Sequence, residues 1–402
     1  MTSEPSPRAR LHQPEVVAEV RRFLEGEDLD GWLLYEFHGL NPVAQSLLGL
    51  GKTTRRGFVL IPREGEPVAL IHAIEASAWR SWPFERRVYS GWRELEEQLG
   101  ALLEGLGRVA MEVSPGGAVP TLDLVPAGLA GFLLELGLEI ASSGDLVSRF
   151  HSVWTPSQRL DHHRAAELVA DVASRAFRRA ADAVREGTPT TEGALSDWIR
   201  AELRSLGLVR EVDCIVAVGA GAADPHYAPD GEGATIVRGD LLLIDLWGGF
   251  KDSVPADQTW MGMMGAGVDD RTREVWEAVR DARDAAVDFL RARFLAGETV
   301  RGYEVDDVAR GVVQARGFGP YFVHRTGHSI DTSLHGSGPN LDNLESRDDR
   351  RLLPGVGFSI EPGVYIPGEM GIRSEINVFW GAEGPEVTPI EIQKEILLLL
   401  DR

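Results

Sequence analysis

The sequence predicts an α/β protein of two domains, a small N-terminal domain over residues 1–155 and a larger one over residues 156–402. Three observations support this prediction. The 402 residues are too many for one ordinary hydrophobic core. The first 150 residues alternate short strand patterns with helix patterns. The remainder repeats one arrangement, in which a long helix and a shorter helix are followed by β-type segments.

The N-terminal elements follow from the spacing of apolar residues. Helical periodicity predicts helices, and short apolar runs bounded by turn residues predict strands. In chain order we expect a helix at 16–24, strands at 31–34, 57–61 and 68–71, a helix at 92–106, a strand at 109–112 and an apolar helix near 122–136. A turn-rich stretch at 153–158 then separates this domain from a long amphipathic helix.

Glycines mark the internal repeat of the second domain. Helices are expected over 159–185 and 192–206, and again over 269–295 and 304–315. Gly187 and Gly207 end the first pair, Gly297 and Gly317 end the second with the same spacing, and each glycine stands where a helix C-cap belongs. The sequence therefore predicts two related α/β halves packed about a pseudo-two-fold axis, with a site shared between their sheets.

Composition excludes several classes of protein. Hydrophobic residues make up 43% and charged residues 26%, the balance of a soluble globular protein. No segment approaches the roughly 20 apolar residues that span a bilayer, and the N-terminus lacks the apolar core of a secretory signal. The net charge of −21 argues against nucleic acid and anionic membranes as partners and fits a cytoplasmic enzyme. The single cysteine, Cys214, excludes an internal disulfide and is expected to be a buried, inert thiol.

Two aspartates interrupt strand patterns in the second domain. The run 241–247 is apolar except for Asp245. Burying a lone ionised carboxylate is costly, so Asp245 needs a charged partner or a cation. Asp257 follows in the segment 254–260, after Gly248 and Gly249, which is hairpin spacing. The two aspartates are therefore expected on neighbouring strands at one place.

Two glutamates repeat this pattern. Glu361 stands at the centre of an expected strand over 358–366, and Glu375 stands in another over 371–379. A single carboxylate in a strand is more often exposed or paired with an arginine, and Arg373 is near enough to neutralise one. One arginine does not neutralise four carboxylates. Two hairpin pairs of carboxylates instead suit hard divalent cations.

Histidines supply nitrogen ligands. His324 and His328 lie in the segment 322–330, His335 follows, and His226 stands in a turn before the strand of Asp245. A lone histidine is usually structural or exposed. The glycine before His328 and the spacing to His335 favour a role in chemistry for this cluster.

The order Asp, Asp, His, Glu, Glu, with Ile-Glu-Pro-Gly at 360–363 and Gly-His at 327–328, resembles the pita-bread metallopeptidases. This superfamily includes methionine aminopeptidase, aminopeptidase P, prolidase and creatinase. The resemblance covers roughly residues 157–400, and the internal repeat agrees with the pseudosymmetry of that fold. The N-terminal α/β domain is similar to that of the creatinase and prolidase branch. The resemblance therefore implies a creatinase-like domain followed by a pita-bread catalytic domain of the X-Pro branch.

The resemblance also implies a dinuclear metal centre. Five side chains would hold two divalent ions per subunit: Asp245, Asp257, His328, Glu361 and Glu375. Of these, Asp257 and Glu375 would bridge both ions. By ligand type manganese, cobalt and zinc fit about equally, and family habit makes manganese the first choice.

Roles in substrate binding and proton transfer are implied as well. Glu361 would accept a proton from the attacking water and pass it to the leaving amine. His226 and His335 would hydrogen-bond the peptide and stabilise the tetrahedral intermediate. His324 would line the proline pocket or contact a substrate carboxylate. Arg373 matches an arginine of the family that lies beside Glu375 near the substrate site.

The surroundings of Asp257 depart from the family pattern. Asp245 and Asp257 are one residue farther apart than usual, which implies a longer turn or a bulge. Pro255 and Ala256 stand where relatives carry an aromatic residue, and Gly336 replaces a common acidic residue after His335. These departures remove no metal ligand. They affect the residues that handle substrate and protons.

The resemblance implies hydrolysis of the peptide bond before proline. Dipeptides (a prolidase) are favoured as substrates, and longer X-Pro-led peptides (an aminopeptidase P) are the alternative. A creatinase-like hydrolase or an inactive binding protein is a distant alternative, because either is expected to have lost metal ligands. A homodimer in the cytoplasm is expected, with X-Pro dipeptides or short peptides as its partners.

Overall fold

The computed structural model describes residues 9–225, 227–229 and 231–401. The chain forms two compact units, Met1–His151 and Ser152–Arg402. This division falls a few residues before the boundary expected from the turn-rich stretch. No described helix is long and apolar enough to cross a membrane.

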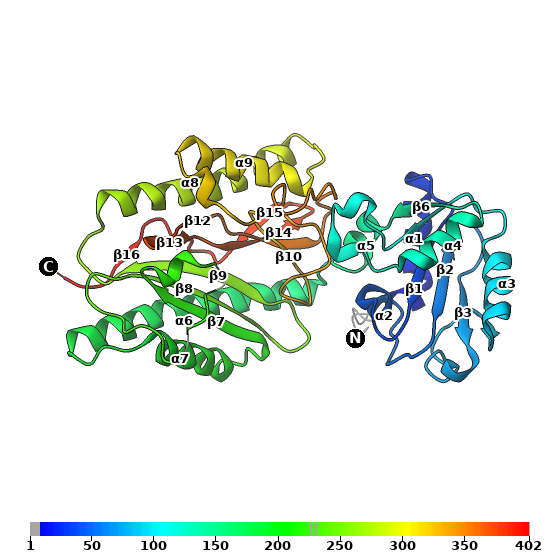
Figure 1. Cartoon of the computed structure of the whole chain (residues 1–402), viewed down its shortest axis with the longest axis horizontal. Coiled ribbons are helices and arrows are strands. Elements are labelled where there is room, and N and C mark those ends of the chain that lie inside the picture. Colours follow the sequence, from blue (N-terminus) through cyan, green and yellow to red (C-terminus); the bar gives the residue numbers. More distant parts are fainter. Residues whose placement is uncertain (1–8, 226, 230, 402) are drawn as a thin grey trace. The chain divides into compact units, whose positions relative to one another are not determined.

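The N-terminal unit is built on a mixed six-stranded sheet with the strand order β4-β3-β2-β1-β5-β6 (Figure 1). Its strands are β1 (Gly31–Glu36), β2 (Gly57–Pro62), β3 (Val68–His72), β4 (Glu85–Tyr89), β5 (Arg108–Met111) and β6 (Glu139–Ser142). Its helices are α1 (Pro14–Gly26), α2 (Pro42–Leu47), α3 (Trp92–Leu103), α4 (Ala127–Glu135) and α5 (Gly144–Phe150). Helices cover both faces of the sheet because alternate residues of β1 point to opposite sides. Trp32 and Leu34 pack in the cluster with α1, α2 and α5, and Leu33 packs in the cluster with α3 and α4.

One predicted N-terminal helix is shorter than expected. The apolar segment near 122–136 becomes helical only from Ala127, after Pro126 with ψ 136°. The residue before a proline is disfavoured in helical geometry, so the helix cannot extend back through Val125. Leu122 instead ends a short 3-10 turn.

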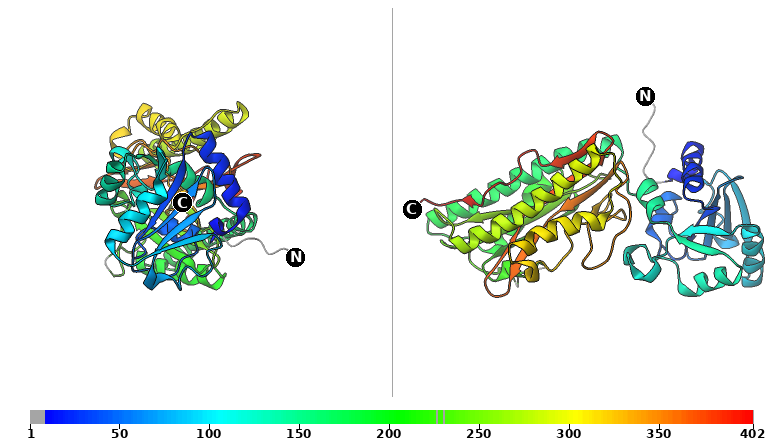
Figure 2. Two further views of the ribbon diagram at one scale, coloured as in Figure 1. Left: turned by 90° about the vertical axis from the view of Figure 1, so that its right-hand side faces the viewer. Right: turned by 90° about the horizontal axis from the view of Figure 1, so that it is seen from above.

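The C-terminal unit consists of two sheets enclosed between two pairs of helices (Figure 1). One sheet has the order β16-β9-β8-β7, the other has the order β10-β11-β14-β15, and β12 and β13 form a separate hairpin. The strands are β7 (Arg210–Val218), β8 (Leu241–Gly249), β9 (Ala256–Met263), β10 (Ser329–Ile330), β11 (Val356–Ile360), β12 (Gly363–Ile366), β13 (Met370–Arg373), β14 (Ile376–Gly381), β15 (Gly384–Thr388) and β16 (Leu397–Leu398). The helices are α6 (Pro156–Arg185), α7 (Glu192–Ser205), α8 (Asp270–Leu295) and α9 (Gly302–Ala315). Seen from above, α8 and α9 lie over the strands (Figure 2).

The repeat predicted from the glycines is confirmed. The helix pairs α6–α7 and α8–α9 each precede β strands. All four glycines that follow these helices adopt the left-handed conformation: φ is 72° at Gly187, 86° at Gly207, 66° at Gly297 and 84° at Gly317. Glycine reaches this conformation without a steric penalty, so it ends each helix and lets the chain turn back.

Alternate side chains of β8 point into two separate parts of the hydrophobic core. Leu242, Ile244 and Leu246 point toward α6 and α7, where they join a buried apolar cluster. Leu241 and Leu243 point to the opposite side and join the core shared with α8 and α9. Asp245 lies on this second side, between the two sheets, so the site is enclosed by the two related halves.

The prediction that Glu361 and Glu375 stand in the middle of continuous strands is wrong. Glu361 and Pro362 separate β11 from β12, and Ser374 and Glu375 separate β13 from β14. β11 pairs with β14 in one sheet, whereas β12 pairs with β13 in the hairpin. Pro362 has no N–H to donate, so the strand ladder is interrupted where the chain passes from one sheet to the other.

Candidate functional site

The first half of the C-terminal unit contributes two aspartates from one face of a β hairpin. Asp245 on β8 lies opposite Thr259 on β9, and Trp247 lies opposite Asp257. Since alternate residues share a face, all four side chains project from the same side of the sheet. The loop over residues 250–255 joins the strands and accommodates the longer spacing of the two aspartates.

The second half contributes two glutamates that lie between strands, Glu361 between β11 and β12 and Glu375 between β13 and β14. The Glu361 backbone N–H donates to the Thr326 carbonyl, and the Glu375 N–H donates to the Thr259 carbonyl. These bonds satisfy backbone groups that have left the ladder. Because Thr259 belongs to β9, the Glu375 bond also connects the second half to the first.

The segment that carries His328 is anchored on both sides. On α9, the Asp306 carboxylate accepts from the N–H and hydroxyl of Thr326, and Arg310 donates to the His324 carbonyl. On β11, a Cβ added to Gly327 would lie 2.0 Å from the Ser359 carbonyl oxygen. This close backbone approach accounts for the glycine that precedes His328.

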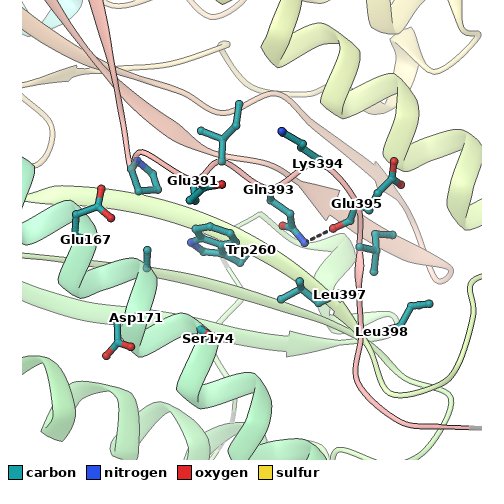
Figure 3. Close-up of a pocket in the computed structure, with 14 residues that line it drawn as sticks. Glu167, Asp171, Ser174, Trp260, Glu391, Gln393, Lys394, Glu395, Leu397 and Leu398 are labelled. Carbon is teal, nitrogen blue, oxygen red and sulfur yellow. Dashed lines mark hydrogen bonds between the residues drawn. The ribbon is translucent and has the colours of Figure 1, made fainter.

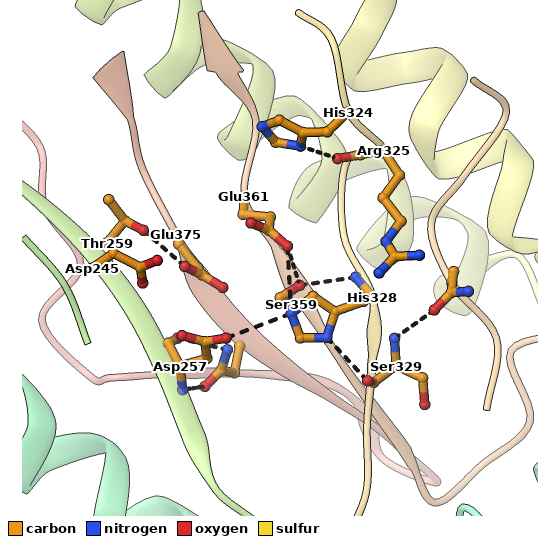
Figure 4. Close-up of polar contacts among 12 residues, drawn as sticks. Asp245, Asp257, Thr259, His324, Arg325, His328, Ser329, Ser359, Glu361 and Glu375 are labelled. Carbon is orange, nitrogen blue, oxygen red and sulfur yellow. Dashed lines mark hydrogen bonds and ion pairs between the residues drawn. The ribbon is translucent and has the colours of Figure 1, made fainter. Parts of the chain in front are cut away.

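Asp257, His328 and Glu375 form a buried group of ligand-type residues. One atom of each lies within 4.8 Å of the others, a geometry that could hold a metal ion. His328 Nε2 is 3.5 Å from Asp257 Oδ2 and 3.5 Å from Glu361 Oε1. Figure 4 shows the side chains of Asp257, Glu361 and Glu375 directed into one space beside His328.

Three carboxylate oxygens at this site, one of them from Asp245, have no hydrogen-bond partner. Within the described part of the chain, Asp245 Oδ1, Asp257 Oδ1 and Glu375 Oε1 are buried and accept no hydrogen bond. Buried polar atoms are nearly always satisfied, so three orphan oxygens in one place call for a cation. Oxygen atoms with one imidazole nitrogen are a donor set that suits divalent transition metals. The residues therefore fit a metal centre.

Without a cation these acids resist ionisation. Burial raises the pKa of Asp245 to about 7 and that of Asp257 to about 8, and it raises the pKa of Glu375 well above its ordinary value. Neighbouring carboxylates add to each shift. Burial also opposes ionisation of Glu361, but His328, His324 and Arg373 together lower its pKa.

His328 is held in the form that a metal requires. Its Nδ1 lies 3.1 Å from the Ser329 carbonyl, an acceptor, so Nδ1 carries the proton and Nε2 keeps its lone pair. Burial lowers the pKa of His328, which keeps the ring neutral. The His335 ring packs edge-on against His328, with centroids 4.3 Å apart. Burial and then the neighbouring His328 lower the pKa of His335 to about 4.

Arg373 is engaged on all three nitrogens and is only 5% exposed. One amino group pairs with Asp245, Nε donates to Thr259 Oγ1 at 2.8 Å, and Nη1 donates to the Tyr365 hydroxyl at 3.2 Å. The same hydroxyl lies 2.8 Å from His324 Nε2. Arg373 thus neutralises Asp245 and connects it to His324 through Tyr365.

These residues line a cavity of about 530 Å³. All the described residues that the sequence marks for the site lie on its wall: Asp245, Asp257, His324, His328, His335, Glu361, Arg373 and Glu375. His226 lies outside the described residues. Trp247, Arg325 and Leu334 also line the cavity, although no sequence pattern marks them as site residues.

Several supporting residues escaped the sequence reasoning. Thr259 Oγ1 donates to Glu375 Oε2 at 2.9 Å, and the Ser359 hydroxyl connects His328 with Glu361. The Asn377 amide forms two hydrogen bonds with the backbone of Asp257 and so ties β14 to β9. Each is a buried polar residue in a strand, and the strands of Ser359 and Asn377 are otherwise apolar. The signal that identified the four acids would have identified these residues too.

A second cavity, of about 670 Å³, lies between α6, β9 and the C-terminal segment (Figure 3). Trp260, Glu167 and Asp171 are among its lining residues, and it contains none of the ligand-type residues described above. Trp260 projects from the face of β9 opposite to that of Asp257 and Thr259.

Comparison with known proteins gives consistent results. Residues 164–380 match the model of metallopeptidase family M24. An Xaa-Pro dipeptidase of Lactobacillus helveticus is 34% identical over 202 residues, and the match spans 50% of either protein, about half the length of that relative. A probable dipeptidase PepE of Mycobacterium tuberculosis is 27% identical over 325 residues, 79% of either chain. The crystal structure of dipeptidase PepE from Mycobacterium ulcerans has the same fold, with a TM-score of 0.72, 22% identity and coverage of 96% of this chain and 97% of that one. Since the family model covers more than half of the residues, this chain belongs to metallopeptidase family M24.

Proposed function

We propose that this protein is a metal-dependent peptidase that hydrolyses the bond before proline, with X-Pro dipeptides as its preferred substrates. The main support is the set of buried, unpartnered oxygens of Asp245, Asp257 and Glu375 around His328. The dipeptide preference is supported by the similarity to an Xaa-Pro dipeptidase of L. helveticus.

Two divalent ions would be held by Asp245, Asp257, His328, Glu361 and Glu375. When bound, such ions lower the pKa of a water molecule and polarise the scissile carbonyl. Manganese is the first choice for the native metal, with zinc and cobalt as alternatives, because the donor set suits all three.

Glu361 is proposed as the group that takes a proton from the attacking water and passes it to the leaving amine. Its pKa is lowered, so it is ionised near neutral pH and can accept a proton. The Ser359 hydroxyl, 3.1 Å from Glu361 Oε1, fixes the direction of the carboxylate. Glu361 would then deliver the proton to the leaving proline nitrogen. An imide nitrogen has no N–H of its own, so it must receive a proton to leave as an amine.

Histidines would position the substrate. His335 faces the cavity beside His328, and a neutral imidazole there can donate a hydrogen bond to the substrate carbonyl. His226 is proposed for the same task. His324 would contact the proline residue, with its ring held by Tyr365. Arg373 would act through Asp245 and Tyr365 as a positioning residue, since its nitrogens are engaged within the protein.

An aminopeptidase P acting on longer peptides is the alternative. The experiment compares Leu-Pro with a longer peptide that begins Leu-Pro, each incubated with manganese-loaded protein while release of leucine is followed. Release from the dipeptide alone supports the proposal, release from the longer peptide alone favours the alternative, and release from neither refutes X-Pro hydrolysis. Asp257→Ala should abolish release, because it removes a proposed metal ligand. A homodimer and a cytoplasmic location stay predictions from the sequence.

A further inference from the structure

The loop between β7 and β8 forms part of the wall of the metal cavity. Two of its residues, Asp224 and Pro225, line the cavity. They follow a short 3-10 turn, Gly221–Ala223, and the Tyr227 N–H donates to the Asp224 carbonyl at 3.1 Å. Connecting segments are generally more mobile than the strands they join, so a loop that borders a reaction site needs an anchor.

The carboxylate of Glu192 anchors this loop at two points. Glu192 is the first residue of α7 and is fully buried. Its Oε1 accepts from the Val218 N–H at 2.9 Å, and its Oε2 accepts from the Tyr227 hydroxyl at 2.8 Å and from the Ala234 N–H at 2.7 Å. Val218 is the last residue of β7, whereas Tyr227 and Ala234 belong to the loop. One carboxylate therefore connects the strand to two separate places in the loop.

A carboxylate is an unusual choice for this buried position. Among the described residues, no lysine or arginine forms an ion pair with Glu192, and burial of an unpaired carboxylate is costly. An apolar side chain would fill the same space without that cost. A carboxylate at the start of a helix instead binds N–H and O–H donors strongly. Burial and the hydrogen bond to Glu192 raise the pKa of Tyr227 to about 12, so the Tyr227 hydroxyl stays protonated and donates.

The loop is also packed closely by both halves of the C-terminal unit. A Cβ added to Gly233, where φ is 67°, would lie 2.4 Å from Glu192 Oε2. On the other side, a Cβ added to Gly371 of β13 would lie 1.6 Å from the Ala222 carbonyl oxygen. Glycine permits both close approaches. The loop is thus held between α7 of the first half and β13 of the second.

The second half contains a comparable anchor. Asp306 on α9 is fully buried and accepts from the N–H and the hydroxyl of Thr326, two residues before His328. In the first half, Tyr227 directly follows His226 in the sequence. In each half, a buried acid on the shorter helix of the pair therefore fixes a segment that is adjacent in sequence to a histidine of the proposed site.

We propose that Glu192 and Tyr227 are positioning residues, which hold the loop between β7 and β8 against the metal cavity so that His226 contacts the substrate carbonyl. His226 has this task in the proposed function, on which the role of Glu192 and Tyr227 therefore rests. Loss of the anchor loosens the loop and leaves the proposed metal ligands in place. An interaction made mainly in the transition state is then weakened, which lowers kcat more than it raises KM. A misplacement of about 1 Å can lower the rate by up to about a hundredfold.

The test uses Tyr227→Phe, which removes the hydroxyl and keeps the ring. In the manganese-loaded protein, kcat for Leu-Pro should fall about tenfold while KM stays within about twofold. The amount of manganese bound per chain should not change, because no proposed ligand is altered. Glu192→Gln should lower kcat at least as far, because an amide nitrogen then replaces one of the two acceptor oxygens.

A double-mutant cycle separates positioning from a general loss of structure. If Tyr227 acts through His226, Tyr227→Phe should lower kcat by less than about twofold once His226→Ala is present. The slow reaction of His226→Ala is followed over hours at high protein concentration. An unchanged kcat in Tyr227→Phe alone, or the same tenfold loss in both backgrounds, would overturn the proposal.

Tyr89→Phe is the matched control. Tyr89 is buried in the N-terminal unit, and its hydroxyl also donates to a single acceptor, the Arg56 carbonyl at 2.7 Å. Its substitution removes the same hydroxyl group at a distance from the loop in sequence and in a different unit. Tyr89→Phe should therefore leave kcat and KM for Leu-Pro unchanged.

Hydrogen exchange separates this proposal from the proposed function. If the wild-type protein cleaves no X-Pro dipeptide, the proposed function has failed, and the anchor is judged by the exchange of the backbone amides over residues 219–235. Exchange about tenfold faster in Tyr227→Phe and in Glu192→Gln, but not in Tyr89→Phe, supports the anchor. Equal exchange in the wild-type protein and these variants refutes it.

Discussion

Ser359→Ala tests whether metal affinity depends on a residue that touches no metal. Ser359 is fully buried on β11. Its Oγ accepts from the His328 backbone N–H at 2.9 Å and donates to Glu361 Oε1 at 3.1 Å. One hydroxyl therefore fixes two proposed metal ligands.

The magnitude follows from these two bonds. Alanine leaves the buried N–H of His328 without its partner, which costs about 1–3 kcal/mol. Loss of the bond to Glu361 adds about 1 kcal/mol. We therefore expect the free energy of unfolding of the metal-free protein to fall by about 2–4 kcal/mol. Freed rotation of Glu361 should also weaken metal binding by about 10- to 100-fold, as is typical when a residue supporting a ligand is removed.

Urea unfolding of the metal-free protein measures the first effect, and calorimetric titration with manganese measures the second. Ser148→Ala is the matched control, because Ser148 is also buried and its hydroxyl donates to the Gly144 carbonyl at 2.9 Å, in the N-terminal unit. It should lower stability by about 1 kcal/mol and leave metal affinity unchanged. If Ser359→Ala binds manganese as tightly as the wild-type protein, Ser359 does not position the ligands and the reasoning is wrong.

Two further predictions concern the backbone at His328 and the titration of the acids. Gly327→Ala places a Cβ 2.0 Å from the Ser359 carbonyl oxygen and should lower the free energy of unfolding, measured in urea, by about 1–3 kcal/mol. In the control Gly311→Ala, the added Cβ meets open space on α9, and the free energy of unfolding should rise by up to about 1 kcal/mol. Equal effects of the two substitutions would contradict the steric argument. In metal-free protein, burial raises the pKa of Asp245 to about 7 and that of Asp257 to about 8, well above the value near 4 in an unfolded chain. The folded state then binds more protons than the unfolded state. The stability that protonation of these two acids contributes is therefore fully present below about pH 4 and is lost as the pH rises through 7 to 8. The Tm of chelator-treated protein should fall as the pH rises from about 5 to about 8. Saturating manganese should raise the Tm by more at pH 8 than at pH 5. A Tm of the chelated protein that rises over this interval would refute the raised pKa values of Asp245 and Asp257.

The sequence predicts those features that depend on local pattern. The run around Asp245 identifies both a buried strand and a residue that needs a cation, because a single carboxylate breaks an otherwise apolar segment. The four helices of the C-terminal unit end near the expected glycines, because a left-handed C-cap residue is a local requirement. Their packing into two halves follows from the repeat.

Features set by distant contacts were beyond these patterns. Arg373 and Asp245 are far apart in the chain, and only the structure shows that their pairing leaves Arg373 no free nitrogen. The break at Glu361 could have been inferred, since Pro362 within a strand pattern is a warning. β4 escaped detection because its sequence, Glu-Arg-Arg-Val-Tyr, is mostly polar and exposed at a sheet edge.

The arrangement of charges links metal binding to the packing of the two halves. Asp245 and Asp257 project from the first half, whereas His328, Glu361 and Glu375 come from the second. Arg373 pairs with Asp245, but Asp257 and Glu375 form no direct ion pair with an arginine or lysine among the described residues. When the pH rises through their raised pKa values and they ionise, their charges oppose the approach of the halves. The Asn377 bonds to the Asp257 backbone and the bond between Glu375 N–H and Thr259 hold the halves together against this repulsion. A divalent ion bound between them would convert the repulsion into attraction, so ligand geometry and the cohesion of the two halves should strengthen together when metal binds.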